Sequence, residues 1–224
     1  MKISLGLLPG LGFTKEIFSR LKIQAEELFY LEWIEPEVNE SLDSYALRMG
    51  SDLKRAKYPL VLLGHSFGGM MASEVSRQYE AQLIILISSV KNREEIPFRF
   101  KSIAPLGLHR LFTKELSLKS LPYWGERFGY KKGEEQELFR KMVSRQTNSY
   151  LQWALKNLSL WDRNISREVP YFHFHGDHDK TFPVQHIKPP FTLIEKGSHM
   201  MVYNQAWKLS QLINTSLETV FNPA

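Results

Sequence analysis

Runs of apolar residues alternate along this chain with stretches of helical periodicity, and that alternation limits the possible folds more than any other feature. "PLVLLG" (59–64) and "AQLIILISSV" (81–90) are almost continuously aliphatic. Strands that are apolar on both faces are typical of a parallel sheet covered by helices on both sides. By the same criterion, further strands are predicted at 3–10, 28–34, 170–176 and 190–197.

Apolar residues at helical spacing predict helices in the segments between these strands. Helices are expected near 15–27, from Ser41 onward, over 67–79 and over 203–219. The predicted fold is therefore α/β, with a mostly parallel central sheet covered by helices on both faces, in one domain over 1–224. The length of 224 residues, 43% of them hydrophobic, suits one such core.

Residues 91–165 interrupt this rhythm. They contain helical patterns such as "EEQELFRKMVSRQ" but no convincing strand. We predict that they form a helical cap inserted into the α/β domain, and we call 91–165 the cap segment. Its aromatic and aliphatic residues are expected to pack mostly against the core, and some to line an apolar pocket.

The composition excludes several classes of protein. The chain has no cysteine, so it has no disulfide framework and no thiol nucleophile. No apolar run approaches the roughly 20 residues that span a bilayer. The first eight residues have a faint signal-peptide character, but Pro9-Gly10 interrupts them and no small-residue cleavage site follows. We read this start as a core strand and predict a cytoplasmic protein.

The net charge of +5 is unevenly distributed. The cap segment has fifteen Lys and Arg against eight Asp and Glu, whereas the rest of the chain carries a small negative balance. A local positive field suggests an acidic substrate or partner. A solvated helical surface rich in lysine explains the same numbers. Nucleic acid is not favoured, because no motif that reads it is present.

A serine motif lies between the third predicted strand and its helix. Gly64-His65-Ser66-Phe67-Gly68 matches G-x-S-x-G in the strand–turn–helix context that this motif needs. The sharp turn strains the serine backbone and requires small neighbours. It also places Ser66 at a helix N-terminus, where free N–H groups stabilise negative charge. Ser66 is the predicted nucleophile, and it needs a base that is oriented by a carboxylate.

With this motif in place, the chain resembles the α/β-hydrolase fold proteins in a compact form. The resemblance extends over nearly the whole chain and is weakest over the cap segment, which falls where many members carry a lid. It implies the chain order nucleophile, acid, histidine, and it implies no metal or organic cofactor.

The resemblance assigns the other two catalytic residues. His199 follows the last predicted strand in "EKGSHMM", which is similar to the family's G-x-x-H segment, and is the candidate base. Residues 175–179, "HGDHD", are similar to H-G-x-x-D and place the acid at Asp179. Asp177 is the alternative acid, but we expect it to hold the turn by accepting backbone N–H bonds. His65 is expected to be a packing or turn residue.

The stretch "HFHGDH" also fits the H-x-H-x-D-H pattern of metallo-β-lactamases. On that alternative, His173, His175, Asp177 and His178 would bind metal. Only 46 residues follow His178, however, which leaves little chain for the remaining ligands. The metal hypothesis would also leave the Ser66 motif unexplained. His173 is more simply read as a buried histidine with a hydrogen-bond partner.

Backbone donors are expected to form an oxyanion hole. One is the N–H of Phe67, directly after the nucleophile. The resemblance assigns the other to Leu11, in a loop where Pro9 replaces the family's usual histidine. Phe13, Trp124 and Trp153 are candidate substrate-binding residues.

Together these features predict a serine hydrolase that cleaves a carboxylic ester or thioester through an acyl-enzyme intermediate. Its substrate is expected to be a small acyl compound, and the charge of the cap segment suggests that it is acidic. The alternatives are a ligand-binding protein that keeps the triad without turnover and the metallohydrolase described above. The oligomeric state, the acyl chain and the leaving group stay open.

Overall fold

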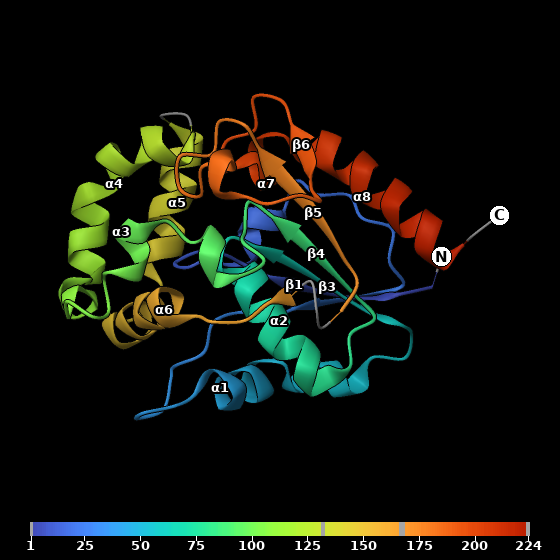
Figure 1. The fold of residues 1–224 in the computed structure, drawn as a ribbon, viewed down its shortest axis with the longest axis horizontal. Coiled ribbons are helices and arrows are strands. Elements are labelled where there is room, and N and C mark those ends of the chain that lie inside the picture. The colour runs from blue at the N-terminus through green and yellow to red at the C-terminus, as the bar shows by residue number, and fades with distance from the viewer. Residues whose placement is uncertain (1, 131–132, 166–168, 223–224) are drawn as a thin grey trace.

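A six-stranded parallel sheet forms the centre of the molecule (Figure 1). The computed structural model describes residues 2–130, 133–165 and 169–222. The strand order is β2-β1-β3-β4-β5-β6, and every neighbouring pair is parallel. The strands are β1 (Ser4–Leu8), β2 (Glu27–Tyr30), β3 (Leu60–His65), β4 (Leu83–Ile87), β5 (Tyr171–Gly176) and β6 (Thr192–Ile194). The predicted α/β class with a parallel sheet is confirmed.

Helices cover both faces of this sheet, as predicted (Figure 1). One face carries α1 (Leu42–Met49) and α2 (Phe67–Tyr79). The other carries η1 (Lys15–Phe18) and α8 (Ala206–Phe221). The connecting elements are η2 (Ser51–Arg55), η6 (Val184–His186) and α7 (Met201–Asn204). Helix α1 begins where its sequence predicts, because the Ser41 hydroxyl accepts a capping hydrogen bond from the Ser44 N–H at 3.2 Å.

The core divides into two apolar clusters, one on each face of the sheet. Alternate residues of the same strand enter opposite clusters: Leu62 packs toward α1 and α2, whereas Leu63 packs toward α8. Both side chains are fully buried. This two-sided burial is the physical reason why the central strands are apolar at every position rather than at every second one.

The cap segment contains helices and no strand among its described residues. Its elements are η3 (Arg93–Glu95), α3 (Phe98–Lys101), η4 (Leu108–Leu111), α4 (Lys114–Phe128), α5 (Glu134–Ser144) and α6 (Asn148–Leu160). The two ends of the segment meet at a single antiparallel bridge between Asn92 and Asn164. The Ile165 N–H also donates to the carbonyl of Lys91 at 2.9 Å. The segment thus leaves the α/β body and returns to it at nearly one point.

The helix predicted near 15–27 is wrong beyond η1. The Lys22 N–H donates to the Ser210 hydroxyl at 2.8 Å, and the Gln24 N–H donates to the Asn214 side chain at 2.9 Å. Both partners lie on α8, which occupies the place on the sheet where a helix would otherwise pack. The segment therefore follows α8 without regular structure and bonds its backbone to polar side chains of that helix.

Most of the predicted strands are shorter in the structure, and the one predicted over 81–90, for example, covers only Leu83–Ile87. The strand predicted over 28–34 ends at Tyr30, because the chain then turns so that the Trp33 indole can donate to the carbonyl of Gly10 at 3.0 Å. The edge strand predicted over 190–197 covers only Thr192–Ile194. Among the described residues, no helix is both long and apolar enough to cross a membrane.

The strand order locates the candidate site. The chain runs outward from β1 to β2 and then returns to place β3 on the other side of β1. Ligands bind at such a reversal, beyond the carboxyl ends of the strands. Residues 9–13 follow β1 and Ser66 follows β3, so both lie at this point.

Candidate active site

The turn that carries Ser66 is strained, as the G-x-S-x-G motif requires. Ser66 has φ 54° and ψ −124°, outside the regions that L-residues ordinarily adopt. A Cβ at Gly64 would lie 2.4 Å from the Gly68 carbonyl oxygen, and one at Gly68 would lie 2.1 Å from the Leu8 carbonyl oxygen. Only glycine fits at both positions.

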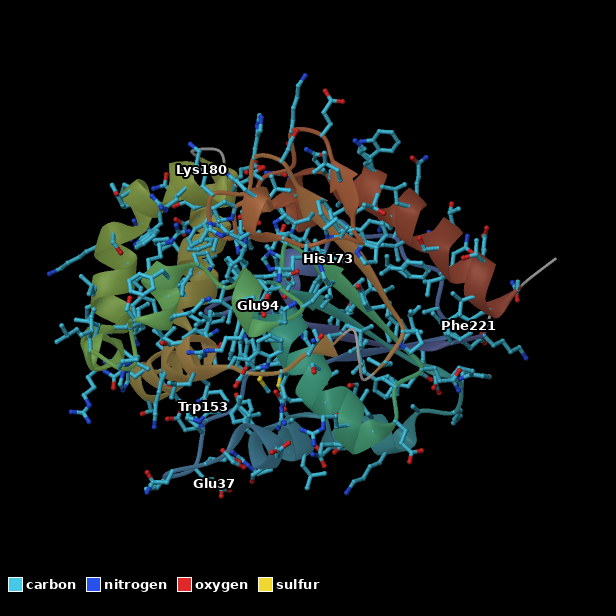
Figure 2. The ribbon with its side chains drawn as sticks, in the orientation of Figure 1. Glu37, Glu94, Trp153, His173, Lys180 and Phe221 are labelled. Carbon is cyan, nitrogen blue, oxygen red and sulfur yellow. The ribbon has the colours of Figure 1, made fainter. Side chains whose placement is uncertain are left out.

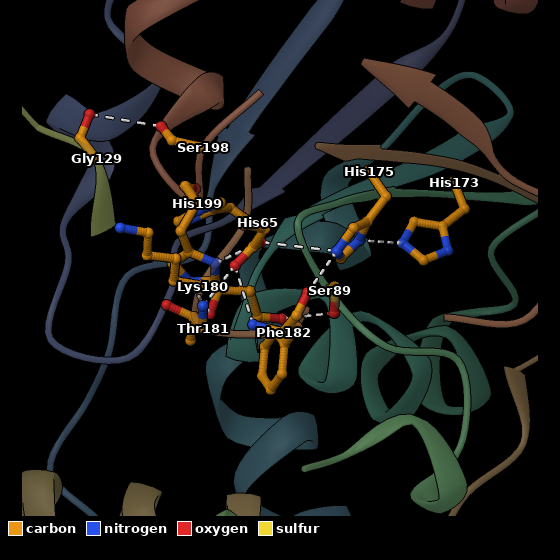
Figure 3. A network of polar contacts seen from close by, with 12 residues as sticks. His65, Ser89, Gly129, His173, His175, Lys180, Thr181, Phe182, Ser198 and His199 are labelled. Carbon is orange, nitrogen blue, oxygen red and sulfur yellow. Dashed lines mark hydrogen bonds and ion pairs between the residues drawn. The ribbon is translucent and has the colours of Figure 1, made fainter. Parts of the chain in front are cut away.

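Hydrogen bonds fix both the N–H and the carbonyl group of Ser66. The Ser66 N–H donates to the carbonyl of Ile87 at 3.0 Å. The Ser89 hydroxyl donates to the Ser66 carbonyl at 2.7 Å (Figure 3). These bonds hold the turn to the end of β4, so the surrounding sheet maintains the strained conformation.

The structure brings Ser66, His199 and Asp179 into one hydrogen-bonded series (Figure 3). His199 Nε2 lies 2.9 Å from Ser66 Oγ, and His199 Nδ1 lies 2.8 Å from Asp179 Oδ2. Because a carboxylate only accepts, Nδ1 carries the proton and Nε2 is free to accept from the serine hydroxyl. All three residues are buried, with 6%, 1% and 3% of the residue surface exposed for Ser66, His199 and Asp179.

Asp179, rather than Asp177, holds the turn after β5. Asp179 Oδ1 accepts from the N–H groups of Thr181 and Phe182 at 2.8 and 2.9 Å, while Oδ2 faces His199. The turn role expected for Asp177 is therefore wrong, and its Oδ1 is buried without a hydrogen-bond partner. Burial raises the pKa of Asp179, but the charge and hydrogen bond of His199 outweigh it and leave the pKa below its usual range.

The loop that carries His199 is attached to the cap segment. The Met200 N–H donates to the Phe128 carbonyl at 3.1 Å. The Asn204 side-chain amide donates to the Gly129 carbonyl at 2.9 Å. The Phe128 ring also packs on the His199 imidazole, with centroids 5.6 Å apart. The position of His199 therefore depends on how α4 ends.

A chain of buried polar groups continues behind Asp179. His175 Nε2 lies 2.8 Å from the Phe182 carbonyl, which only accepts, so this nitrogen carries the proton. His175 Nδ1 must then accept from His173 Nε2 at 3.1 Å, and His173 Nδ1 in turn accepts from the Lys91 ammonium at 3.3 Å. One carbonyl thus sets the tautomer of both histidines (Figure 3).

Both histidines in this chain are neutral. Burial, followed by the charge of its partners, lowers the pKa of His173 well below the usual value. Burial also lowers the pKa of His175, against the opposing charge of Asp179. His175 Nε2 lies 3.8 Å from Asp179 Oδ2, so its N–H dipole points its positive end toward the carboxylate. His173 is the buried, hydrogen-bonded residue that the sequence predicts.

These contacts do not fit the metal alternative. All four ring nitrogens of His173 and His175 already take part in hydrogen bonds, and one of their partners is the Lys91 ammonium, whose charge repels a cation. Asp177 is half-buried and His178 is exposed. Among the residues that the structure describes, no group of three His, Cys, Asp or Glu is arranged to hold a metal ion.

An apolar cavity of about 230 Å³ opens onto Ser66 and His199. Residues of the cap segment form most of its wall: Phe100, Ile103, Phe112, Leu121, Trp124, Phe128, Phe139, Val143, Leu151, Leu155 and Leu158. The predicted pocket residues Phe13 and Trp124 are among the residues that line it, together with Leu11.

Trp153 does not belong to this lining, so its predicted place in the pocket is wrong. Its indole ring stacks on Tyr45 with centroids 4.0 Å apart and donates to the Glu40 carbonyl at 3.3 Å. Figure 2 shows Trp153 at the side of the molecule that carries α1. The sequence marked Trp153 only as an aromatic residue of the cap segment, and its position on α6 turns it toward α1 rather than toward the cavity.

Comparisons with known proteins agree with this architecture. Residues 34–89, which include the Ser66 turn, match the model of the thioesterase domain. A thermophilic esterase is 18% identical, with a TM-score of 0.71 over 97% of this chain and 90% of that one. The N-acyl homoserine lactonase AidH, complexed with N-butanoyl homoserine, is 12% identical, with a TM-score of 0.72 over 100% and 91%.

A bromoperoxidase from Bacillus anthracis is 14% identical, with a TM-score of 0.70 over 96% of this chain and 92% of that one. The chain has the α/β-hydrolase fold. A comparison with curated proteins finds no match. Because the structural neighbours differ in activity, what this α/β-hydrolase fold protein does must be argued from its own site.

Trp33 holds the loop after β1 in place. The Trp33 indole donates to the Gly10 carbonyl at 3.0 Å and stacks between Phe67 and Tyr150, with centroids 5.5 and 5.2 Å away. The N–H groups of Leu11 and Phe67 have no acceptor among the described residues. Both amides are thus free to serve as donors at the site.

Sequence reasoning missed Trp33 and Lys91 and understated His65. The His65 Nε2–H donates to the His199 carbonyl at 2.9 Å, and burial lowers the pKa of His65 to about 3. Neither Trp33 nor Lys91 belongs to a motif, and each meets its partner only after folding. For His65 the signal was its place beside Ser66, but the direction of its ring depends on the loop of His199.

Proposed function

We propose that this α/β-hydrolase fold protein cleaves a carboxylic ester or thioester through an acyl-enzyme intermediate. The observation that carries the proposal is the 2.9 Å contact between Ser66 Oγ and the unprotonated nitrogen of His199 at the edge of an apolar cavity. The match of residues 34–89 to the thioesterase domain supports the same chemistry.

Each step uses an atom of the site. Ser66 Oγ attacks the substrate carbonyl carbon while His199 Nε2 takes its proton, and Asp179 stabilises the imidazolium that forms. The N–H groups of Leu11 and Phe67 stabilise the tetrahedral oxyanion. Such donors are each worth about 10²–10³ in kcat in other enzymes.

The intermediate then collapses and the leaving group departs. His199 gives its proton to the departing alkoxide or thiolate, and the acyl group stays on Ser66. Water repeats the sequence on the acyl-enzyme, with His199 again as base, and releases the carboxylic acid. The apolar cavity holds the acyl chain. The proposed mechanism uses no metal or organic cofactor.

A fluorophosphonate probe tests the nucleophile. We expect one equivalent of label on Ser66, and loss of labelling in Ser66→Ala and His199→Ala. Ser117 is the other serine that lines the cavity, and its hydroxyl donates to the Thr113 carbonyl at 2.8 Å. Ser117→Ala is therefore the matched control and should label fully. Labelling that survives in Ser66→Ala would overturn the assignment.

A substrate panel tests the reaction. p-Nitrophenyl esters and acyl thioesters of graded chain length should be hydrolysed, with a maximum at the length that fills the cavity. Folded protein that neither labels nor turns over any member would instead support the non-catalytic, ligand-binding alternative. Activity that a chelator abolishes would contradict the serine mechanism.

A further inference from the structure

Three cationic side chains lie at or next to the cavity. Arg99 on α3 and Arg127 on α4 line the cavity together with Ser66 and His199. Arg127 also lines a second hollow with Lys180, which follows Asp179 in the turn after β5. Figure 2 shows Lys180 on the side of the molecule that carries α4 and α5. We call Arg99, Arg127 and Lys180 the cationic entrance.

Among the described residues, the members of this entrance form no ion pair with a carboxylate, although the charge of Asp179 acts on Arg99 in the direction that raises its pKa. Among the described side chains, no Asp or Glu lies within ion-pair distance of any of its three members, whereas Arg48 and Arg145, for example, pair with Glu40 and Glu16. Burial and then the charge of Arg127 lower the pKa of the Arg99 guanidinium, which indicates that the two cations repel each other.

Arg99 is held in position by backbone rather than by an opposite charge. Its Nη2 donates to the carbonyls of Lys180 and Thr181, at 2.8 and 2.5 Å. These two residues directly follow Asp179 in the turn. The contacts fix the guanidinium beside the catalytic turn without an ion-pair partner among the described residues, which is the arrangement that an anionic ligand would complete.

The shape of the cavity orients the substrate and so determines which part of it lies near these charges. With the carbonyl carbon at Ser66, the acyl chain lies in the cavity against the apolar wall formed by the cap segment. The other arm must point toward the group that protonates it, because His199 donates to the leaving group. The turn that bears Asp179 and the cationic entrance lie on the His199 side of the site.

We propose that the leaving group of the substrate carries an anion, a carboxylate or a phosphate, that binds at Arg99, Arg127 and Lys180. This inference rests on the proposed hydrolysis and deepens it by naming the chemical class of the alcohol or thiol. It also gives the positive balance of the cap segment a specific role. The guanidinium groups suit either anion, since both accept paired N–H bonds.

Matched thioesters test the proposal. The butanoyl thioesters of 3-mercaptopropionate and 3-mercaptopropionamide have the same length and differ by one negative charge. We expect kcat/KM for the charged thioester to exceed that for the neutral one by about tenfold at low ionic strength, and the ratio to fall as salt screens the exposed site. The butanoyl thioester of 2-mercaptoethyl phosphate shows which anion binds better.

Variants locate the effect. Arg127→Gln and, separately, Lys180→Gln should each lower the charged-to-neutral ratio by at least about threefold. Lys119→Gln is the matched control, because Lys119 is exposed on the same helix as Arg127 and outside the cavity. It should leave the ratio unchanged.

A ratio near one in the parent protein, or equal losses in Lys119→Gln and Arg127→Gln, would overturn the anionic leaving group. Hydrolysis of the neutral thioester would still stand in that case, so the proposed function would survive. Failure to hydrolyse any thioester or ester in the panel would refute both.

Discussion

Replacing Asp179 by asparagine changes one atom of the site, and the surrounding hydrogen bonds fix how the new side chain must lie. Asp179 Oδ1 accepts from two backbone N–H groups at 2.8 and 2.9 Å. An amide nitrogen there would face two donors, so the carboxamide must keep its oxygen in that position. The NH₂ group then takes the place of Oδ2, 2.8 Å from His199 Nδ1.

This orientation reverses the histidine tautomer. The new NH₂ donates to His199 Nδ1, which must give up its proton, so Nε2 becomes protonated. Nε2 then faces Ser66 Oγ as a donor over 2.9 Å and can no longer take the serine proton. The same change in a serine protease lowers kcat by about 10⁴, or about 5 kcal/mol of transition-state stabilisation. We expect a loss of that order in kcat/KM.

Asp177→Asn is the matched control, because Asp177 lies in the same turn without contacting His199. We expect it to stay within about threefold of the parent, as changes away from the reacting atoms usually do. Steady-state hydrolysis of the best panel substrate gives kcat/KM, and circular dichroism checks that both variants fold. If Asp179→Asn kept more than a tenth of the activity, or Asp177→Asn lost more, the assignment of the acid would be wrong.

Three further predictions concern the groups around the triad. Because the pKa of His65 falls to about 3 on folding, the unfolded chain binds more protons between pH 6.5 and 3, and the free energy of unfolding must decrease as the pH is lowered through this range. In urea unfolding, His65 alone should lower the free energy of unfolding by about 2 kcal/mol from pH 8 to pH 5. His65→Gln, which keeps a hydrogen-bond donor, should make the free energy of unfolding less dependent on pH over this range. His175→Leu should lower the free energy of unfolding by about 2 kcal/mol and kcat/KM by about tenfold, since the Phe182 carbonyl and the His173 N–H lose their partner; unchanged activity would show that His175 does not position Asp179. The pKa of Glu16 is lowered to about 2, with burial opposed by hydrogen bonds from Thr14 and Arg145, so its contribution is complete above pH 4.5 and is lost as pH falls toward 2. Glu16→Gln should therefore narrow the stability difference between pH 5 and pH 3 by about 0.5 kcal/mol, and an identical acid transition in parent and variant would rule this out.

Much of the fold could be predicted because its signals are local. The apolar runs at β3 and β4 are buried on both faces, so their composition by itself indicates a covered parallel sheet. The Ser66 turn is likewise local, since the glycines at 64 and 68 are required by atoms that the turn itself brings close. The candidate acid and base could be named because the segments after the last two strands resemble the H-G-x-x-D and G-x-x-H segments of the α/β-hydrolase fold proteins.

The wrong predictions have a common cause, which is contact between segments that are distant in the sequence. The periodicity of 15–27 favoured a helix, but α8, nearly two hundred residues away, occupies that face and bonds the backbone instead. Trp153 has the spacing of a pocket residue, and only the position of α1 turns it toward Tyr45. No local pattern reports which neighbour a side chain will meet.

The sequence by itself determined the layered parallel sheet, the strained serine turn and the short list of residues able to serve it. Only the tertiary structure decided that Asp179 takes the backbone bonds expected of Asp177, that Lys91 and two neutral histidines stand behind it, and that Arg99 and Arg127 line the cavity without an ion pair among the described residues. Backbone periodicity depends on neighbours in sequence, whereas protonation, tautomer and charge balance depend on atoms that meet through space, and folding alone brings those atoms together.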